Sequence, residues 1–362
     1  MTINEIENTE KEIIVDDSLV WHITHNDGDG LGCALVADKH LGEYSKKRIH
    51  TVFSPIPVVE EKINEMIKSS LPVLPKIILI SDLSISVNMA KFLNEMMKKY
   101  NNEWLLVDHH PTNNLSDMFS RCFVTTNTSI SAAINLDDIL SHGCKSPRIQ
   151  SMGNKNKLCK IIKYISDYDT WEWKNNPNAI FYKDDFIYYD TCMHEDLITK
   201  VIDSLGINIT YELLSEHLMS DKPTLYPKLF EELYVRTIKA RDNAIKNLSD
   251  EVVTVKDIDY GILRGYTVIR DNFTNDKAHS ILENTDIDMI ISVDSITGRI
   301  EVRSKESCDI DCGKYCEEHF SGGGHKHAAG GRLSAAQYDA FINFYYSKII
   351  ERKYDEEKSY KK

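Results

Sequence analysis

Short apolar runs alternate with amphipathic segments along the first half of the chain. The apolar runs have the length and the β-branched or aromatic content of buried strands, and they lie at 19–23, 48–53, 76–80 and 104–107. The segments between them place apolar residues at helical spacing, over 30–41, 59–69 and 87–100. This alternation predicts an α/β fold in which helices cover both faces of a parallel sheet.

The pattern changes twice along the rest of the chain. Further helices are predicted at 130–140 and 158–165, and the stretch from 195 to 248 is mostly helical. A new block follows, with predicted strands at 252–255, 262–269, 289–293 and 300–303 and a closing helix at 335–350. We therefore expect a larger α/β domain over 1–190, a helical connector over 191–248 and a smaller α/β domain over 249–362.

The composition is that of an ordinary globular protein. A chain of 362 residues with 42% hydrophobic and 27% charged residues can form two cores. Its longest apolar runs are too short to cross a bilayer, and residues 1–17 lack the basic start and apolar stretch of a secretory signal. We expect a cytoplasmic protein without a membrane partner. The net charge of −13 argues against binding along long nucleic acid, but it allows a short anionic substrate at a site that holds cations.

Eight cysteines occur without a secretory context, so free thiols are expected. Cys308, Cys312, Cys316 and His319 would share one face of a helix, which raises the alternative of a zinc site. Burial in a core is the stronger interpretation, because free cysteine behaves as a small apolar residue and structural zinc usually draws on short loop spacings.

Acidic and imidazole residues gather at four places, each directly behind an apolar run. Function in a parallel sheet gathers at the carboxyl ends of the strands, so three of these places should meet at one edge of the sheet. A Gly-rich turn or a helix N-cap would explain any single cluster, but not all four in such positions. The residues are His25, Asp27 and Asp29, then Asp82, then Asp108, His109 and His110, and finally Asp167 and Asp169.

This set of side chains has the chemistry of a two-metal centre. Carboxylate oxygens with two or more imidazoles suit a pair of divalent ions of the Mn²⁺ or Mg²⁺ type. Asp82 stands alone behind its strand, so its two oxygens could bridge both ions. Of His109 and His110, one could bind metal while the other donates to a phosphoryl oxygen, and Asp108 could orient an imidazole. Such a centre most often activates water against a phosphorus ester.

The C-terminal block carries a candidate anion site. Gly322, Gly323 and Gly324 expose backbone N–H groups that can cradle an anion, and His325 follows them. Arg303 lies on the strand before them and could clamp a phosphate through two hydrogen bonds. A flexible loop and a surface arginine are the plain alternatives.

With these motifs in this order, the chain resembles the DHH phosphoesterase superfamily, and in particular its branch with a C-terminal DHHA1 domain. That branch includes nanoRNases and RecJ-like exonucleases. The resemblance extends from His25 to Gly331. It implies an N-terminal DHH domain, a smaller DHHA1 domain that holds the substrate, and two Mn²⁺ ions, with Mg²⁺ as the other candidate.

The resemblance also implies a role for each motif residue. The ion ligands would come from all four clusters: His25 and Asp27 for one ion, Asp29, His109 and Asp167 for the other, and Asp82 as the bridge. Asp169 fits the fourth motif as well as Asp167 does, and we prefer Asp167. His110 would face phosphate beside Asp108. Arg303 and the segment from Gly322 to His325 would bind the far end of the nucleotide.

The expected activity is that of a manganese-dependent phosphodiesterase that releases mononucleotides from short oligonucleotides or linear dinucleotides. A phosphatase for nucleoside 3′,5′-bisphosphate and a cyclic-dinucleotide phosphodiesterase are related alternatives. The alternative from another class is a non-catalytic nucleic-acid-binding scaffold, which has no need to retain the complete ligand set. Long duplex is not an expected partner, and a homodimer is left open.

Overall fold

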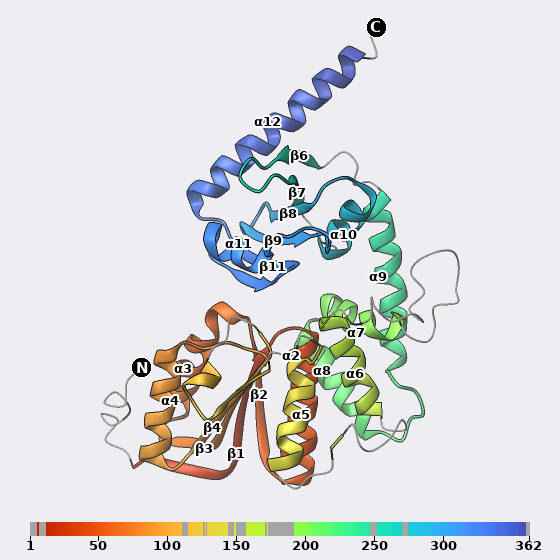
Figure 1. Cartoon of the computed structure of the whole chain (residues 1–362). Helices are drawn as coiled ribbons and strands as arrows, with labels where there is room; N and C mark the ends of the chain where they lie inside the picture. Colours follow the sequence, from red (N-terminus) through yellow and green to blue (C-terminus); the bar gives the residue numbers. More distant parts are fainter. Residues whose placement is uncertain are drawn as a thin grey trace. The chain divides into compact units, whose positions relative to one another are not determined.

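The computed structural model describes residues 6, 12–110, 115–125, 127, 129–143, 148–149, 157–170, 172, 192–246, 252–269 and 274–359. The chain divides into two compact units, residues 1–235 (unit 1) and 236–362 (unit 2). Each unit contains its own sheet (Figure 1).

Unit 1 is built on a parallel sheet. Its five strands in the described part of the chain run in the order β2-β1-β3-β4-β5. The predicted strands are confirmed, whereas β5 is too short to give a recognisable apolar run and was not predicted. The strands are β1 (Ile14–His25), β2 (Arg48–Ser54), β3 (Val73–Ser81), β4 (Glu103–Asp108) and β5 (Cys122–Val124).

Alternation along the central strands supplies two cores, one on each face of this sheet. On β3, Ile78 and Ile80 belong to one core and Leu79 to the other. One face is covered by α3 (Val59–Ser70) and α4 (Val87–Tyr100). The other is covered by α2 (Gly28–Ala37), α5 (Ala132–Gly143), α6 (Lys157–Asp169), α7 (Cys192–Leu205) and α8 (Ile207–Met219) (Figure 1). The prediction of helices on both faces is therefore confirmed.

Local sequence signals set the bounds of α4, the helix that leads from β3 to β4. Ser86 caps its N-terminus by accepting the Met89 N–H at 3.2 Å, and Asn101 ends it in the left-handed conformation. The observed helix, Val87–Tyr100, has the predicted bounds.

Most of the segment predicted as a separate connector packs into unit 1. Leu197 and Val201 on α7 and Leu214 on α8 lie in the core shared with α2 and α5. The long helix α9 (Lys228–Lys246) begins in the same core through Phe230, and its last turns belong to unit 2, where Ile245 packs beside α10. The apolar faces of α7 and α8 explain the difference, because each needs the helices of unit 1 to cover it.

Unit 2 contains a mixed sheet, whose six strands in the described residues run β10-β11-β9-β8-β7-β6. Only β7 and β8 are parallel; the other pairs are antiparallel. The Gly-rich segment is a hairpin rather than a loop. The strands are β6 (Val253–Lys256), β7 (Leu263–Ile269), β8 (Met289–Asp294), β9 (Arg299–Ser304), β10 (Gly323–His325) and β11 (Ala328–Arg332).

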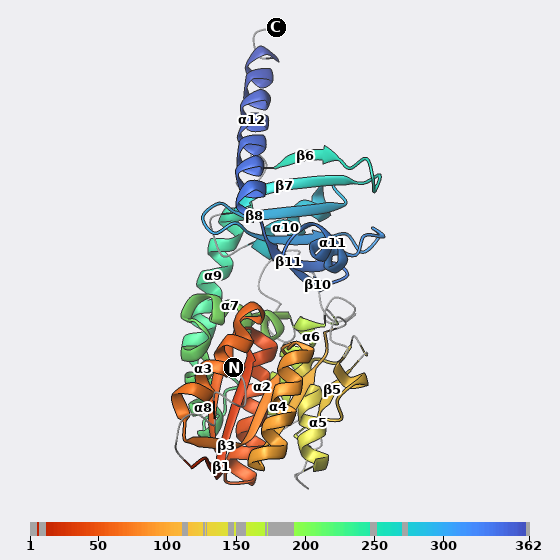
Figure 2. The same cartoon turned by 90° about the vertical axis from the view of Figure 1, so that its left-hand side faces the viewer.

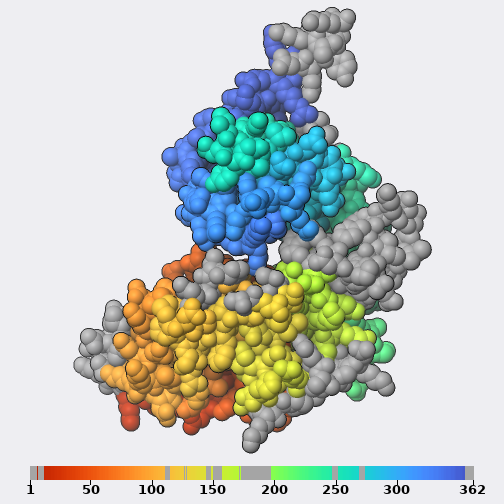
Figure 3. Space-filling model, in the orientation of Figure 1, coloured from red at the N-terminus to blue at the C-terminus, as the bar shows by residue number. Residues whose placement is uncertain are grey.

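In the described residues, unit 2 also contains the helices α10, α11 and α12. α10 (Thr274–Asn284) packs through Ile281 and Leu282 against Ile290, and α11 (Cys312–His319) lies in a second core with β8, β9 and β11. The closing helix, α12 (Ala335–Ser359), packs on this core through Phe341, and its last turns extend past the sheet of unit 2 (Figures 1 and 2). The space-filling view shows the described part of α12 in blue beside the strands of unit 2 (Figure 3). Ile350 on this helix is 67% exposed.

The cysteines of α11 and the turn before it are core residues. Cys308, Cys312 and Cys316 are buried together, and burial raises the pKa of Cys312 to about 11 and that of Cys316 to about 12. Within the described residues these cysteines do not belong to a group with metal-binding geometry. The core interpretation is therefore favoured over zinc.

Within the described part of the chain, no helix combines the length and the apolar content needed to cross a membrane.

Candidate metal centre

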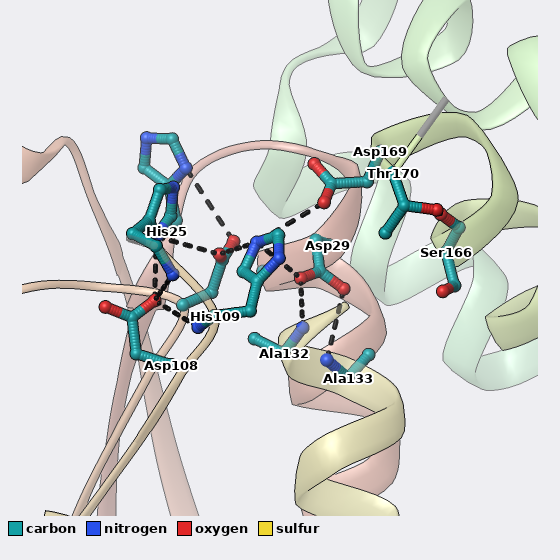
Figure 4. Close-up of polar contacts among 12 residues, drawn as sticks. His25, Asp29, Asp108, His109, Ala132, Ala133, Ser166, Asp169 and Thr170 are labelled. Carbon is teal, nitrogen blue, oxygen red and sulfur yellow. Dashed lines mark hydrogen bonds and ion pairs between the residues drawn. The ribbon is translucent and has the colours of Figure 1, made fainter. Parts of the chain in front are cut away.

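The carboxyl ends of three neighbouring strands bring the predicted ligands together (Figure 4). His25 is the last residue of β1, Asp82 directly follows β3, and His109 directly follows β4. Asp27 caps α2 by accepting the Gly30 N–H at 3.0 Å. The order β1-β3-β4 places these ends side by side, as the predicted topology requires.

A glycine allows α2 to begin immediately behind β1. A Cβ atom on Gly30 would lie 2.0 Å from the carbonyl oxygen of His25, so only glycine fits there. The resulting turn holds the Asp27 Oδ2 atom 2.6 Å from the His25 Nδ1 atom. Two of the predicted ligands are thus fixed by a single tight connection.

Asp82 occupies an unusual backbone conformation at the centre of the cluster. Its φ of 54° is in the left-handed region, which is rare for residues other than glycine and is often found at functional sites. The Asp82 N–H donates to the Val107 carbonyl at 2.9 Å and holds this conformation. Its carboxylate oxygens lie 3.7 Å from the His25 Nδ1 atom and 3.5 Å from the His109 Nε2 atom. One carboxylate therefore stands between two imidazoles.

Asp29 is held by the start of α5, more than a hundred residues later in the chain. Its carboxylate accepts the N–H groups of Ala132 at 2.7 Å and Ala133 at 3.1 Å (Figure 4). The positive end of the α5 dipole stabilises a negative charge there. The Asp29 Oδ2 atom lies 3.6 Å from the His109 Nε2 atom.

The structure brings Asp169, and not Asp167, to this cluster. The Asp169 Oδ2 atom lies 3.3 Å from the His109 Nε2 atom, whereas Asp167 pairs with Lys163 on another face of α6. The end of α6 is held by Thr170, whose N–H and hydroxyl both donate to the Ser166 carbonyl. The preference for Asp167 is thus corrected. Asp167 and Asp169 are two residues apart on a helix, so their side chains lie on opposite faces. A signal for Asp169 existed, because it continues the i, i+4 row of Ile161 and Ile165, both buried.

Asp108 orients the second histidine of its motif. Its Oδ1 atom lies 2.7 Å from the His110 Nδ1 atom and also accepts the His109 N–H at 2.8 Å. Burial disfavours the charged imidazole, but the carboxylate of Asp108, together with the charges of Asp169 and Asp27, outweighs this effect and raises the pKa of His110 to about 9. Ser84, which sequence reasoning did not single out, donates to the Asp108 Oδ2 atom at 3.1 Å.

These side chains fit divalent cations. Among the residues that the structure describes, three groups have ligand atoms within 4.8 Å of one another: His25 with Asp27 and Asp82, Asp29 with His109 and Asp169, and Asp82 with His109 and His110. In the described residues, the buried Oδ2 atoms of Asp82 and Asp169 have no hydrogen-bond donor. Burial, then the charges of Asp27 and Asp29, raise the pKa of Asp82 well above its usual range. A cation would compensate this accumulation of negative charge.

The predicted anion site of unit 2 is a row across three strands. Arg303 pairs with Ala328, which pairs with His325, so the three residues share one face of the sheet. Arg303 is mostly buried, hydrogen-bonded to Asn275 and to the Ala329 carbonyl, and 3.7 Å from Glu301. It is therefore not a plain surface arginine.

The glycines of this segment have a structural reason as well. A Cβ atom on Gly322 would lie 2.0 Å from the Gly330 carbonyl oxygen, and Gly324 has a φ of 146°. The close approach of the strands in this hairpin therefore requires glycine at these two positions.

Comparisons with known proteins agree with this picture. No family model matches the chain. A 3′,5′-cyclic-nucleotide phosphodiesterase of Helicobacter pylori is 21% identical over 358 residues, covering 87% of this chain and 92% of that relative. RecJ of Thermus thermophilus, solved in complex with Mn²⁺, has a TM-score of 0.55 and 16% identity, covering 92% of this chain and 52% of RecJ. An exonuclease RecJ bound to manganese gives the same TM-score with 14% identity, covering 92% of this chain and 90% of the other.

These likenesses show the fold. The chain has the fold of RecJ, with a parallel-sheet unit followed by a mixed-sheet unit. The fold that the resemblance to the DHH phosphoesterases implied is therefore confirmed.

Proposed function

We propose that the chain is a metal-dependent phosphodiesterase that hydrolyses short nucleotide substrates. The observation that carries the proposal is the convergence of a complete ligand set on one sheet edge, with Asp82 and His109 each shared between groups of metal-binding geometry. A nucleic-acid-binding scaffold on the same fold would gain nothing from burying so many carboxylates together, because their desolvation is unfavourable without a cation.

In this proposal, two Mn²⁺ or Mg²⁺ ions are held by residues of unit 1. His25 and Asp27 would hold one ion, Asp29, His109 and Asp169 the other, and Asp82 would contact both. When bound, the ions would supply positive charge next to the phosphorus ester and lower the pKa of a water molecule. Asp169 replaces Asp167 because only Asp169 lies beside His109.

His110 would act on the phosphoryl group. The neighbouring carboxylates, Asp108 first among them, raise the pKa of His110, and an imidazole in its charged form can donate a hydrogen bond to a non-bridging oxygen. Asp108 would hold the ring in place through the Nδ1 atom.

We further propose that the substrate is a short oligonucleotide or a linear dinucleotide, with Arg303 and the segment from Gly322 through Gly323 and Gly324 to His325 binding a second phosphate. The net charge of −13 supports a few-nucleotide substrate over long duplex. A 3′,5′-cyclic nucleotide is the second candidate, and the similarity to the Helicobacter pylori phosphodiesterase favours it.

The deciding experiment compares substrates with Mn²⁺ present. RNAs of a few nucleotides, a linear dinucleotide, a 3′,5′-cyclic nucleotide, a cyclic dinucleotide and a nucleoside 3′,5′-bisphosphate are assayed side by side. Asp82→Ala should abolish turnover of the preferred substrate, whereas Asp167→Ala should retain it. Binding of oligonucleotide without turnover of any substrate would instead support the scaffold.

The role of Arg303 is tested by kinetics on the preferred substrate. Arg303→Ala should raise KM about 10-fold with a smaller change in kcat, because a charge-assisted hydrogen bond to phosphate contributes roughly 1.5–3 kcal/mol. Arg299→Ala is the matched control, since Arg299 lies on the same strand but is exposed. An unchanged KM for Arg303→Ala would remove this residue from the substrate site.

A further inference from the structure

A chain of buried hydrogen bonds runs through the residues next to the metal cluster. The His22 Nε2 atom lies 2.7 Å from the Ser81 Oγ atom. Ser81 donates its hydroxyl to the Thr24 Oγ1 atom at 2.9 Å, and Thr24 donates its own to the Gly30 carbonyl at 3.2 Å. The side chains of His22, Thr24 and Ser81 are fully buried. We call these three residues, with the Gly30 carbonyl, the buried relay.

The direction of every bond in the buried relay is fixed. The Gly30 carbonyl can only accept, so the hydroxyl of Thr24 must donate to it and the hydroxyl of Ser81 must donate to Thr24. His22 must then donate from Nε2. Burial lowers the pKa of His22 to about 3, in keeping with a neutral imidazole, and the directions of the other two bonds place its proton on Nε2. Such a directional chain has a single low-energy arrangement.

Three members of the buried relay adjoin a proposed ligand. Thr24 precedes His25, Ser81 precedes Asp82, and Gly30 follows Asp29. Thr24 and Ser81 are also register partners across β1 and β3. The relay therefore joins the two strand ends and the first turn of α2, whose relative positions decide the distances among these ligands.

We propose that Thr24 and Ser81 are positioning residues that set the affinity of the centre for its two cations. The proposal rests on the proposed function, because its ligands are those of the proposed centre. Neither hydroxyl touches a cation; both act by holding the neighbouring backbone, including the left-handed backbone of Asp82. Loss of either hydroxyl would increase the distances among the ligands. It would therefore weaken cation binding directly, and would affect the chemical step only through that loss of binding.

The test measures Mn²⁺ binding to the full-length protein without substrate, by isothermal titration calorimetry. Thr24→Val and Ser81→Ala should each raise the Kd for Mn²⁺ about 10-fold, the low end of the effect of residues that orient metal ligands. Thr24→Ser and Ser81→Thr keep a hydroxyl and should restore most of the affinity.

Matched controls come from the same unit. Thr210→Val also removes a fully buried hydroxyl that donates to a glycine carbonyl, here Gly206 at 2.8 Å, and Ser141→Ala removes a buried serine hydroxyl on α5. Both controls should bind Mn²⁺ as the wild type does. All titrations are run well below each variant's melting temperature; if Ser81→Ala does not fold, the isosteric Thr24→Val decides.

The outcomes separate the two proposals. A wild-type protein that fails to bind two Mn²⁺ ions would defeat the proposed function itself. A wild type that binds both ions, with unchanged Kd values for Thr24→Val and Ser81→Ala or with equal losses in Thr210→Val, would overturn only the role of the buried relay.

Discussion

At the scale of single residues, position on a helix decides which aspartate takes part in the site. Asp169 and Asp167 lie near the end of α6, but only Asp169 faces His109, at 3.3 Å. We expect Asp169→Asn to weaken Mn²⁺ binding about 10–100-fold, because it removes a charged ligand. Asp167→Asn should bind as the wild type does, since it loses only the pair with Lys163, which is largely exposed. Calorimetric titration of both variants checks this, and equal losses would contradict it.

Another residue-scale prediction concerns pH and His22. Burial lowers its pKa from 6.5 to about 3, so folding favours the neutral imidazole. The stabilisation is fully present above pH 6.5 and is lost as pH falls, because the unfolded chain takes up the proton first. The free energy of unfolding should therefore drop by about 2.3 kcal/mol between pH 6.5 and 4.5 on account of this group.

The measurement is urea unfolding of the metal-free protein against pH. His22→Gln keeps a side-chain N–H donor but cannot titrate, so its stability should fall less steeply over this range than that of the wild type. Parallel pH curves for the two proteins would show that His22 titrates normally.

At the scale of elements, the junction between β1 and α2 depends on Gly30. Gly30→Ala would place a methyl group 2.0 Å from a backbone oxygen of His25, so the strand or the helix must shift. We expect a loss of about 3 kcal/mol in the free energy of unfolding, together with weaker Mn²⁺ binding. Gly143→Ala is the control, because a Cβ atom there meets no atom within 4 Å. Urea unfolding measures both, and a harmless Gly30→Ala would show that the junction can relax.

The elements also show what the sequence could predict. Long apolar or amphipathic runs, such as those of β3 and α4, can be identified as strand or helix from their own residues. The order of these elements along the chain indicated the sheet edge where His25, Asp82 and His109 meet. Short strands such as β5 and β10 could not be predicted, because pairing with adjacent strands stabilises them and their own residues form no recognisable pattern. The hydrogen bonds from the start of α5 to Asp29, and those within the buried relay, join segments that are far apart in the sequence. No local sequence signal predicts such contacts.

At the scale of the whole molecule, the two units have separate cores, and all the proposed cation ligands belong to unit 1. Mn²⁺ should therefore stabilise unit 1 selectively. At a concentration of 100 times Kd the gain would be about 2.7 kcal/mol. Hydrogen–deuterium exchange with and without Mn²⁺ should show slower exchange in the sheet of unit 1 and little change in that of unit 2, and EDTA should reverse the effect. Equal protection of both sheets would contradict this assignment.

The position of Asp169 at the end of α6 has a consequence for how the protein is made. His25, Asp82 and His109 leave the ribosome well before it, so a nascent chain can stack its first strands while the cluster still lacks an aspartate. Capture of the ion proposed for Asp29, His109 and Asp169 would then follow the docking of α6. A chain stalled before that helix would keep a nearly formed sheet and an incomplete metal centre.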